Sequence, residues 1–178
     1  AYAPLTVAVD AITVVVNKEN TWATCLTIDQ LAAIWGPDST IEAWNEVDPA
    51  FPAEPIKLFG PGTDSGTFDY FTDAVNGEEG ASRTDFTPSE DDNVIVQGVS
   101  GSNGGLGYFG YTYYEENADS LNAVQIDSGA GCVTPSAATA QDGTYTPLAR
   151  PLFVYPSVNA LAKPEVTAFF QFYVDNDA

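Results

Sequence analysis

The sequence predicts an α/β domain in which helices flank a largely parallel or mixed β-sheet. Runs of β-branched and apolar residues alternate along the chain with segments whose apolar residues recur at helical spacing. At residues 60–67 a glycine-rich turn joins one such strand directly to a helix. With 178 residues, of which 44% are hydrophobic, the chain is long enough to build one ordinary domain core.

The first predicted elements follow from composition and capping signals. Residues 5–17 are β-branched and mostly apolar, and they predict a long strand that is buried on both faces. Thr27 and Gln30 form a capping box, which predicts a helix that ends at Gly36-Pro37. The proline-rich residues 44–55 that follow are typical of a packed loop.

The remaining elements alternate in the same way. Strands are predicted at residues 56–59, 106–109, 122–126 and 152–155, and helices at 89–100, 111–117 and 163–174. Phe68, Phe71 and Val75 keep helical spacing and predict a further helix after the glycine-rich turn. The acids Glu90, Asp91 and Asp92 stand near the positive end of the helix that Ser89 would start. Their spacing lacks the alternation of a calcium loop, so a calcium site is the weaker interpretation. The aromatic run at 108–114 indicates core packing rather than a platform for sugars.

The charge of the chain excludes several partners. Five Lys and Arg residues stand against 25 Asp and Glu residues, which gives a net charge of −20. Charged residues are only 17% of the chain, against about 25% in a typical domain. The negative charge therefore comes from a scarcity of basic residues and not from a great excess of acids. A protein that binds nucleic acid or an anionic membrane needs a basic surface, so we expect neither as a partner. An acidic surface of this kind is typical of adaptation to salty water.

Residue types that are absent limit the chemistry further. The sequence has no histidine, which removes the usual Ser-His-Asp and Cys-His catalysis and most zinc sites. We therefore expect no enzyme, no metal and no cofactor. Cys25 and Cys132 favour one long-range disulfide in an oxidising compartment, with a buried free pair as the alternative. Methionine is absent even at position 1, so we expect a chain that is processed, trimmed or a fragment and that has lost any export signal.

The strongest candidate site is the turn that precedes the helix of Phe68, Phe71 and Val75. Ser65, Gly66 and Thr67 stand where that helix begins, and the first N–H groups of a helix have no internal partner. The helix dipole adds a partial positive charge, Gly66 leaves the approach open, and two hydroxyls add donors. Together these features predict a compact oxyanion site that needs no lysine. The alternative is plain helix capping by Thr63, Asp64 or Ser65.

Arg83 is the second candidate. It is one of two arginines, and Asp85 lies two positions further on. A guanidinium suits a tetrahedral oxyanion, and a nearby carboxylate can hold it in position. The alternative is an exposed ion pair that contributes little.

Several segments resemble one known family. The stretch Gly60-Pro61-Gly62-Thr63-Asp64-Ser65-Gly66-Thr67-Phe68-Asp69-Tyr70-Phe71 is similar to the phosphate-site segment of the periplasmic phosphate-binding proteins, which deliver phosphate to an ABC transporter. The likeness extends, in family order, to residues 82–86, 89–93, 107–111 and 150–153. It covers nearly the whole chain, and this co-occurrence favours ligand binding over plain capping at the turn.

The resemblance implies that this chain is mainly one lobe of a type II periplasmic binding protein-like fold. The two lobes of such a protein close on the ligand like a hinge. It implies that Ser65, Gly66 and Thr67 bind inorganic phosphate, that Arg83 adds its guanidinium, and that Asp64 orients Arg83 or caps the helix. It also implies a receptor without catalysis, in the periplasm or outside the cell, that works with an ABC transporter permease. A scaffold or adhesion module that keeps the lobe without tight phosphate binding is the alternative. A further alternative is a hydrolase that uses a pair of carboxylates, but nothing in the sequence marks a particular pair of acids.

The resemblance also predicts how the chain is divided. The family's first lobe begins with a glycine-serine-serine-threonine turn that supplies ligand donors, and that turn is not found here. We expect residues 1–15 to be the hinge strand of the first lobe and residues 16–147 to be the second lobe. Residues 148–178 would be the return strand and helix of an incomplete first lobe, whose remainder is absent, removed or on another chain.

Overall fold

A computed structural model describes residues 1–175 of the chain. Its internal contacts divide the chain into two compact units. The core unit comprises residues 11–149, and the terminal unit combines residues 1–10 with those from 150 on. Each unit is described by itself.

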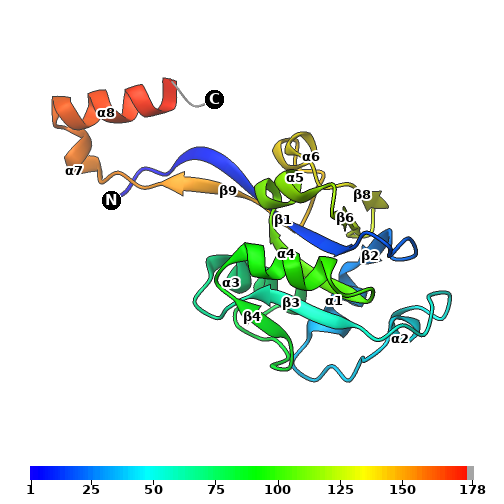
Figure 1. Ribbon diagram of the computed structural model, residues 1–178. Coiled ribbons are helices and arrows are strands. Elements are labelled where there is room, and N and C mark those ends of the chain that lie inside the picture. The colour runs from blue at the N-terminus through cyan, green and yellow to red at the C-terminus, as the bar shows by residue number, and fades with distance from the viewer. Residues whose placement is uncertain (176–178) are drawn as a thin grey trace. The chain divides into compact units, whose positions relative to one another are not determined.

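The larger sheet of the core unit is mixed, as the sequence predicts. Its strands are β1 (Leu5–Asn17), β3 (Lys57–Pro61), β4 (Thr87–Ser89), β5 (Gly105–Gly110) and β6 (Leu121–Ala123). They lie in the order β4-β3-β5-β1-β6, and β1 pairs in addition with β9 (Ala149–Val154) (Figure 1). Strand β3 runs parallel to both β4 and β5, whereas β1 is antiparallel to β5 and β6. The carboxyl ends of β3, β4 and β5 therefore share one edge of the sheet.

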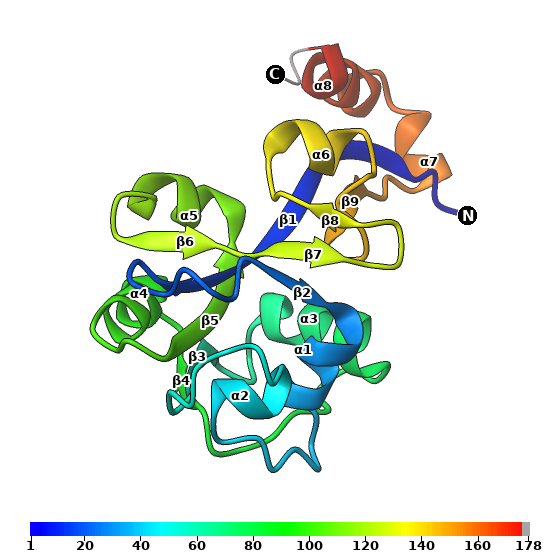
Figure 2. The same ribbon diagram turned by 90° about the vertical axis from the view of Figure 1, so that its right-hand side faces the viewer.

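Helices cover both faces of this sheet. Helix α4 (Asp92–Ser100) packs on one face, and α1 (Ile28–Trp35) and α3 (Gly66–Asn76) lie together on the other (Figure 2). The alternation of side chains along β3 shows this, since Leu58 joins the cluster that contains Trp35 and Phe71, whereas Phe59 packs against the cluster of α4. The first cluster is dominated by aromatic rings, and Trp35 meets the ring of Tyr108 edge-on at 5.0 Å between centroids.

A smaller sheet lies at the start of α1, because one of its strands leads directly into that helix. It consists of β2 (Cys25–Thr27), β7 (Gln125–Asp127) and β8 (Cys132–Val133), in that order. A disulfide joins Cys25 to Cys132 across β7, which agrees with the pairing favoured by the sequence. The core unit is completed by three short helices, α2 (Trp44–Val47), α5 (Tyr111–Asn117) and α6 (Ala137–Gln141).

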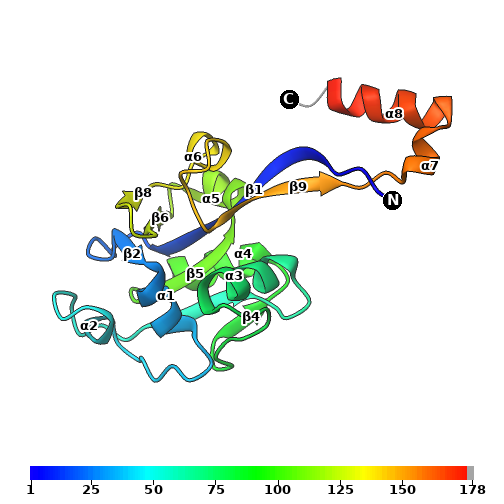
Figure 3. The ribbon, with the colours of Figure 1, turned by 180° about the vertical axis from the view of Figure 1, so that it is seen from behind.

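The terminal unit exposes most of its large apolar side chains. It contains β9, α7 (Val158–Leu161) and α8 (Pro164–Asp175), and α7 leads directly into α8 (Figure 3). Neither helix buries a residue. The exposed apolar residues of this unit include Tyr2, Leu152, Phe153, Tyr155, Val158, Phe169, Phe172, Tyr173 and Val174.

The structure corrects several element predictions. The second half of β1, Ala11–Asn17, is buried throughout, whereas in its first half only Val7 is buried. The predicted helix at 89–100 begins later, because Ser89 ends β4 and Asp91 caps α4. The predicted strand at 122–126 is two strands, β6 and β7, which belong to different sheets. The predicted loop at 44–55 contains α2, whose Trp44 is fully buried.

Within residues 1–175, no helix combines the length and the apolar character that crossing a bilayer requires.

Replacing both Cys25 and Cys132 by serine is expected to lower the free energy of unfolding by about 2–4 kcal/mol. The disulfide joins residues 107 positions apart, so its loss frees a long loop in the unfolded chain. Urea unfolding of the wild type, with and without reductant, and of the double variant measures this. An unchanged midpoint would contradict the prediction.

Candidate functional site

The turn between β3 and α3 is closed by backbone hydrogen bonds. The N–H of Ser65 donates to the carbonyl of Gly62 (3.1 Å), and the N–H of Asp69 donates to the carbonyl of Ser65 (3.1 Å). Ser65 is the N-cap of α3, because its Oγ accepts the N–H of Thr67 (3.2 Å). The helix therefore begins directly beyond the carboxyl end of β3, the edge at which open α/β sheets bind ligands.

The start of α3 is open on one side, at Gly66. Apart from its neighbours in the helix, no atom lies within 4 Å of the point where a side chain at Gly66 would begin. The first N–H groups of a helix point beyond its end, where the dipole favours an anion. The Ser65 hydroxyl accepts one hydrogen bond and keeps its own proton to donate. The structure thus brings Ser65, Gly66 and Thr67 together, and it leaves Asp64 exposed beside them.

A cavity of about 400 Å³ lies beside this turn. It is lined by Gly62, Thr63, Thr84, Phe86, Pro88, Ser89 and Glu90. The carboxylate of Glu90 rests against Gly62, since a Cβ at residue 62 would lie 1.9 Å from Glu90 Oε1. Phe86 forms a firm wall, because its ring stacks on Phe68 and meets Trp35 edge-on.

The rim of this cavity is acidic. Among the described residues that line it there is no lysine or arginine, and Glu90 is followed by Asp91 and Asp92. Burial raises the pKa of Asp92, and the charges of Asp91 and Glu90 raise it further. The Oδ1 of Asp91 caps α4 by accepting the N–H of Asn93 (2.9 Å). No group of three His, Cys, Asp or Glu side chains suited to a metal ion occurs in residues 1–175.

Sequence reasoning missed the place of Glu90, which it interpreted only as an acid at the start of a helix. The missing signal was the pairing of β3 with β4. Pro61 is in register with Ser89, so the residues that follow the two strands meet at the same edge. A short strand around Thr87–Ser89, predicted as parallel to β3, would have brought Glu90 to the turn.

Arg83 is buried, with 8% of its surface exposed, and protein groups take most of its donors. Its Nε and Nη2 donate to the two carboxylate oxygens of Asp85 (2.6 and 2.8 Å), and this pairing lowers the pKa of Asp85. Its Nη1 donates to the carbonyls of Ile34 (3.1 Å) and Ile41 (2.9 Å). Arg83 therefore joins the end of α1 to the segment that follows it.

Arg83 and the turn line different cavities. The cavity of Arg83, about 380 Å³, also contains Lys57 and Asp85 but no residue of the turn. Lys57 begins β3 and the turn follows its end, whereas Arg83 precedes the parallel strand β4. Thr84, which follows Arg83, nevertheless lines the cavity beside the turn. The role of Arg83 as a phosphate ligand stays a prediction, and its burial among protein groups favours a structural role instead.

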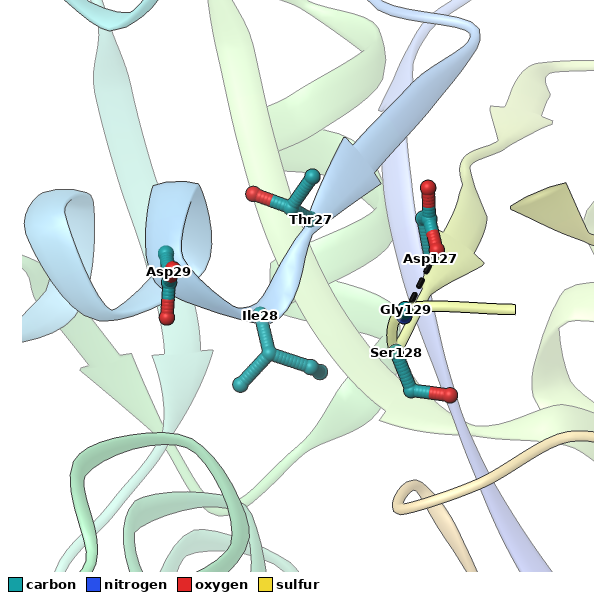
Figure 4. A pocket seen from close by; sticks show the side chains of 6 residues that line it. All are labelled: Thr27, Ile28, Asp29, Asp127, Ser128 and Gly129. Atoms are coloured by element: carbon teal, nitrogen blue, oxygen red, sulfur yellow. Dashed lines mark hydrogen bonds between the residues drawn. The ribbon is translucent and has the colours of Figure 1, made fainter. Parts of the chain in front are cut away.

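Another cavity, of about 260 Å³, lies between the start of α1 and the loop that follows β7. Figure 4 shows its lining residues, among them Asp29 and Asp127. Oδ1 of Asp127 accepts the N–H groups of Gly129 (2.7 Å) and Gly131 (3.0 Å). This carboxylate therefore stabilises its own loop, and the cavity has no arrangement that indicates a ligand.

Comparison with known proteins identifies the family. Residues 2–177 match the family model described as the PBP superfamily domain. The chain is 48% identical over 178 residues to the protein SphX of Synechocystis sp., covering 98% of this chain and 53% of the relative. It is 37% identical over 161 residues to the phosphate-binding protein PstS of Staphylococcus saprophyticus, covering 90% of this chain and 49% of the relative.

Solved structures agree. A possible phosphate-binding protein from Planctomyces limnophilus is 50% identical, with a TM-score of 0.90 over 96% of this chain and 61% of that one. An ABC-type phosphate transport receptor from Vibrio cholerae, at 20% identity, shows the same fold with a TM-score of 0.80 over 99% of this chain and 67% of that one. The chain spans about half the length of the curated relatives it matches. It belongs to the PBP superfamily, and its predicted resemblance to the phosphate-binding proteins is confirmed.

Proposed function

We propose that this chain binds inorganic phosphate at the start of α3, as part of the extracytoplasmic receptor of an ABC-type phosphate importer. The observation that carries the proposal is the open first turn of α3 at Gly66, which lies at the carboxyl edge of the sheet. The names of its relatives support the choice of anion, since they include a phosphate-binding protein and a phosphate transport receptor.

Neutral donors bind the anion in this proposal. The hydroxyls of Ser65 and Thr67 meet the phosphate oxygens where the backbone leaves the approach open at Gly66, while the helix dipole stabilises the charge. Such donors bind and release an oxyanion without a bond being made or broken. The proposed protein is therefore a receptor rather than an enzyme.

The two units suggest how the receptor is divided. We assign the core unit to the second lobe and the terminal unit to part of the first. The exposed apolar side chains of the terminal unit then pack against the rest of the first lobe, in the same polypeptide or in another chain. The disulfide of the core unit suits a periplasmic or extracellular protein, where the receptor meets the permease.

One observation favours a second candidate. The chain spans about half the length of its relatives, so a lobe that retains the fold as a scaffold or adhesion module without tight phosphate binding is the competing function. Binding measurements on the chain separate the two.

Gly66→Ala is expected to weaken phosphate binding at least about tenfold without destabilising the fold. The added methyl group meets no other atom within 4 Å, but it occupies the space through which the anion reaches the N–H groups. Alanine also favours a helix by up to about 1 kcal/mol over glycine. Titration calorimetry with phosphate, paired with thermal unfolding, measures both effects.

Ser65→Ala is the second variant, and Ser136→Ala is its matched control. Both serines cap a helix of the core unit, and Ser136 Oγ accepts the N–H of Thr139 (3.1 Å) away from the cavity. Both substitutions are expected to cost about 1 kcal/mol of stability, but only Ser65→Ala should weaken phosphate binding. Wild-type protein that binds no phosphate, or equal binding by the two serine variants, would contradict the proposal.

Arg83→Ala is expected to destabilise the fold by about 2–3 kcal/mol and to change the phosphate affinity of the folded protein less than about threefold. The carbonyls of Ile34 and Ile41 lose their donor, whereas the start of α3 is not touched. Urea unfolding and calorimetry on the folded variant measure the two quantities. A folded variant that has lost phosphate binding would establish Arg83 as a ligand.

The association rate of phosphate is expected to rise with added salt. The net charge of −20 repels an approaching anion, and salt screens that repulsion. Trp35 contacts Phe86 of the cavity wall, so tryptophan fluorescence in a stopped-flow instrument can follow binding. An association rate that falls with added salt would contradict this prediction, because it would mean that attraction near the site outweighs the repulsion by the net charge.

A further inference from the structure

The sequence contains two Asn-Gly pairs, Asn76-Gly77 and Asn103-Gly104. In such a pair the backbone nitrogen of the glycine can attack the side-chain amide carbon of the asparagine, because glycine has no side chain to hinder the approach. A bond forms between that nitrogen and the amide carbon, the bond to the amide nitrogen breaks, and ammonia leaves. The cyclic imide that results takes up water at one of its two carbonyls. The product is aspartate or isoaspartate, and either one adds a negative charge.

The fold engages both reacting groups of the first pair. Nδ2 of Asn76 donates to the carbonyl of Ala81 (2.6 Å), and the N–H of Gly77 donates to the carbonyl of Asp73 (2.9 Å) at the end of α3. Attack by the Gly77 nitrogen therefore requires this end of the helix to open. The free energy of that local opening adds to the barrier of the reaction.

The second pair occupies an exposed turn that holds neither group. The N–H of Gly105 donates to the carbonyl of Ser102 (2.8 Å), so Asn103 and Gly104 are the two central residues of a tight turn. This turn uses the N–H of Gly105 and leaves that of Gly104 available. Asn103 is exposed, and within residues 1–175 its side-chain amide makes no hydrogen bond.

The residue beside Asn103 is fixed by the core, so a change in the backbone there has a structural effect. The carbonyl of Gly104 accepts the N–H of Lys57 (3.1 Å) and Nε1 of the fully buried Trp44 (3.2 Å). Gly104 has no space around it, since a Cβ there would lie 1.9 Å from the carbonyl oxygen of Pro55. Isoaspartate inserts an extra methylene into the backbone directly before Gly104, and the carbonyl is then displaced from its two donors.

We propose that Asn103 is a site of spontaneous modification, at which the nitrogen of Gly104 closes the imide, whereas Asn76 is protected by the end of α3. Water is the only co-reactant, and ammonia is the group that leaves. Formation of isoaspartate loosens the attachment of Trp44 to the start of β5. The inference is independent of the proposed phosphate site, because β5 runs parallel to β3 and begins at the edge of the sheet opposite to α3.

The experiment follows both pairs by peptide mapping with mass spectrometry after incubation of the intact chain in mildly alkaline buffer, folded and in urea. In the folded chain Asn103 is expected to react at least about tenfold faster than Asn76. In urea the two rates should converge, because the end of α3 no longer protects Asn76. Equal rates in the folded chain, or a tenfold difference that persists in urea, would overturn the inference.

Two variants of the exposed Asn103 separate the reaction from its effect. Asn103→Gln keeps a side-chain amide but would have to close a larger ring, so it should abolish the modification and leave the rate at Asn76 unchanged. Asn103→Asp carries the new charge on a backbone of normal length. The isoaspartate form, separated by ion exchange, should unfold at a lower urea concentration than Asn103→Asp and differ from it in tryptophan emission. An isoaspartate form that matches Asn103→Asp in both would overturn the assigned effect on Trp44.

Discussion

The position of the first turn of α3 is the constraint on which the rest of this structure depends. Because β3, β4 and β5 are parallel, the segments that leave their carboxyl ends meet at one edge of the sheet. The hydrogen bond from Ser65 to Gly62 closes the turn within four residues, so the helix begins before the chain has left that edge. Packing of Phe71 of α3 against Trp35 and Tyr108 then holds the helix on the sheet. A site made of backbone N–H groups is only as well ordered as the helix that carries them, and this core supplies that order.

The structure separates two kinds of polar group that sequence reasoning had joined. Arg83 carries a full charge, yet it is buried among carbonyls and the Asp85 carboxylate, where it connects α1 to the following segment. The turn carries no positive side chain, yet the helix dipole and the hydroxyls at the start of α3 suit an anion. The predicted contact of Arg83 with a bound anion therefore stays a prediction, because protein groups already occupy most of its donors.

Much of the fold follows from local signals. The capping box of Thr27 and Gln30, with both hydrogen bonds formed, starts α1 where it was predicted, and the strand over Leu5–Asn17 has the predicted bounds. Pairing between distant segments has no such signal. The apolar run near Val124 is divided between two sheets, and β4 is three residues long with a proline at its centre, which sequence patterns disfavour. The Ser65–Thr67 turn was predictable because its chemistry is contiguous, whereas the cavity that includes Glu90 is assembled by strand pairing.

The proposed binding of an anion by an acidic chain is less paradoxical once distance is considered. Charges spread over the exterior act through water and are screened beyond about 8 Å at physiological ionic strength. Helix dipoles and N–H groups act on the atoms they touch, and exclusion of water from a cavity strengthens them. The exterior therefore governs how often an anion arrives, and the turn governs how long it stays.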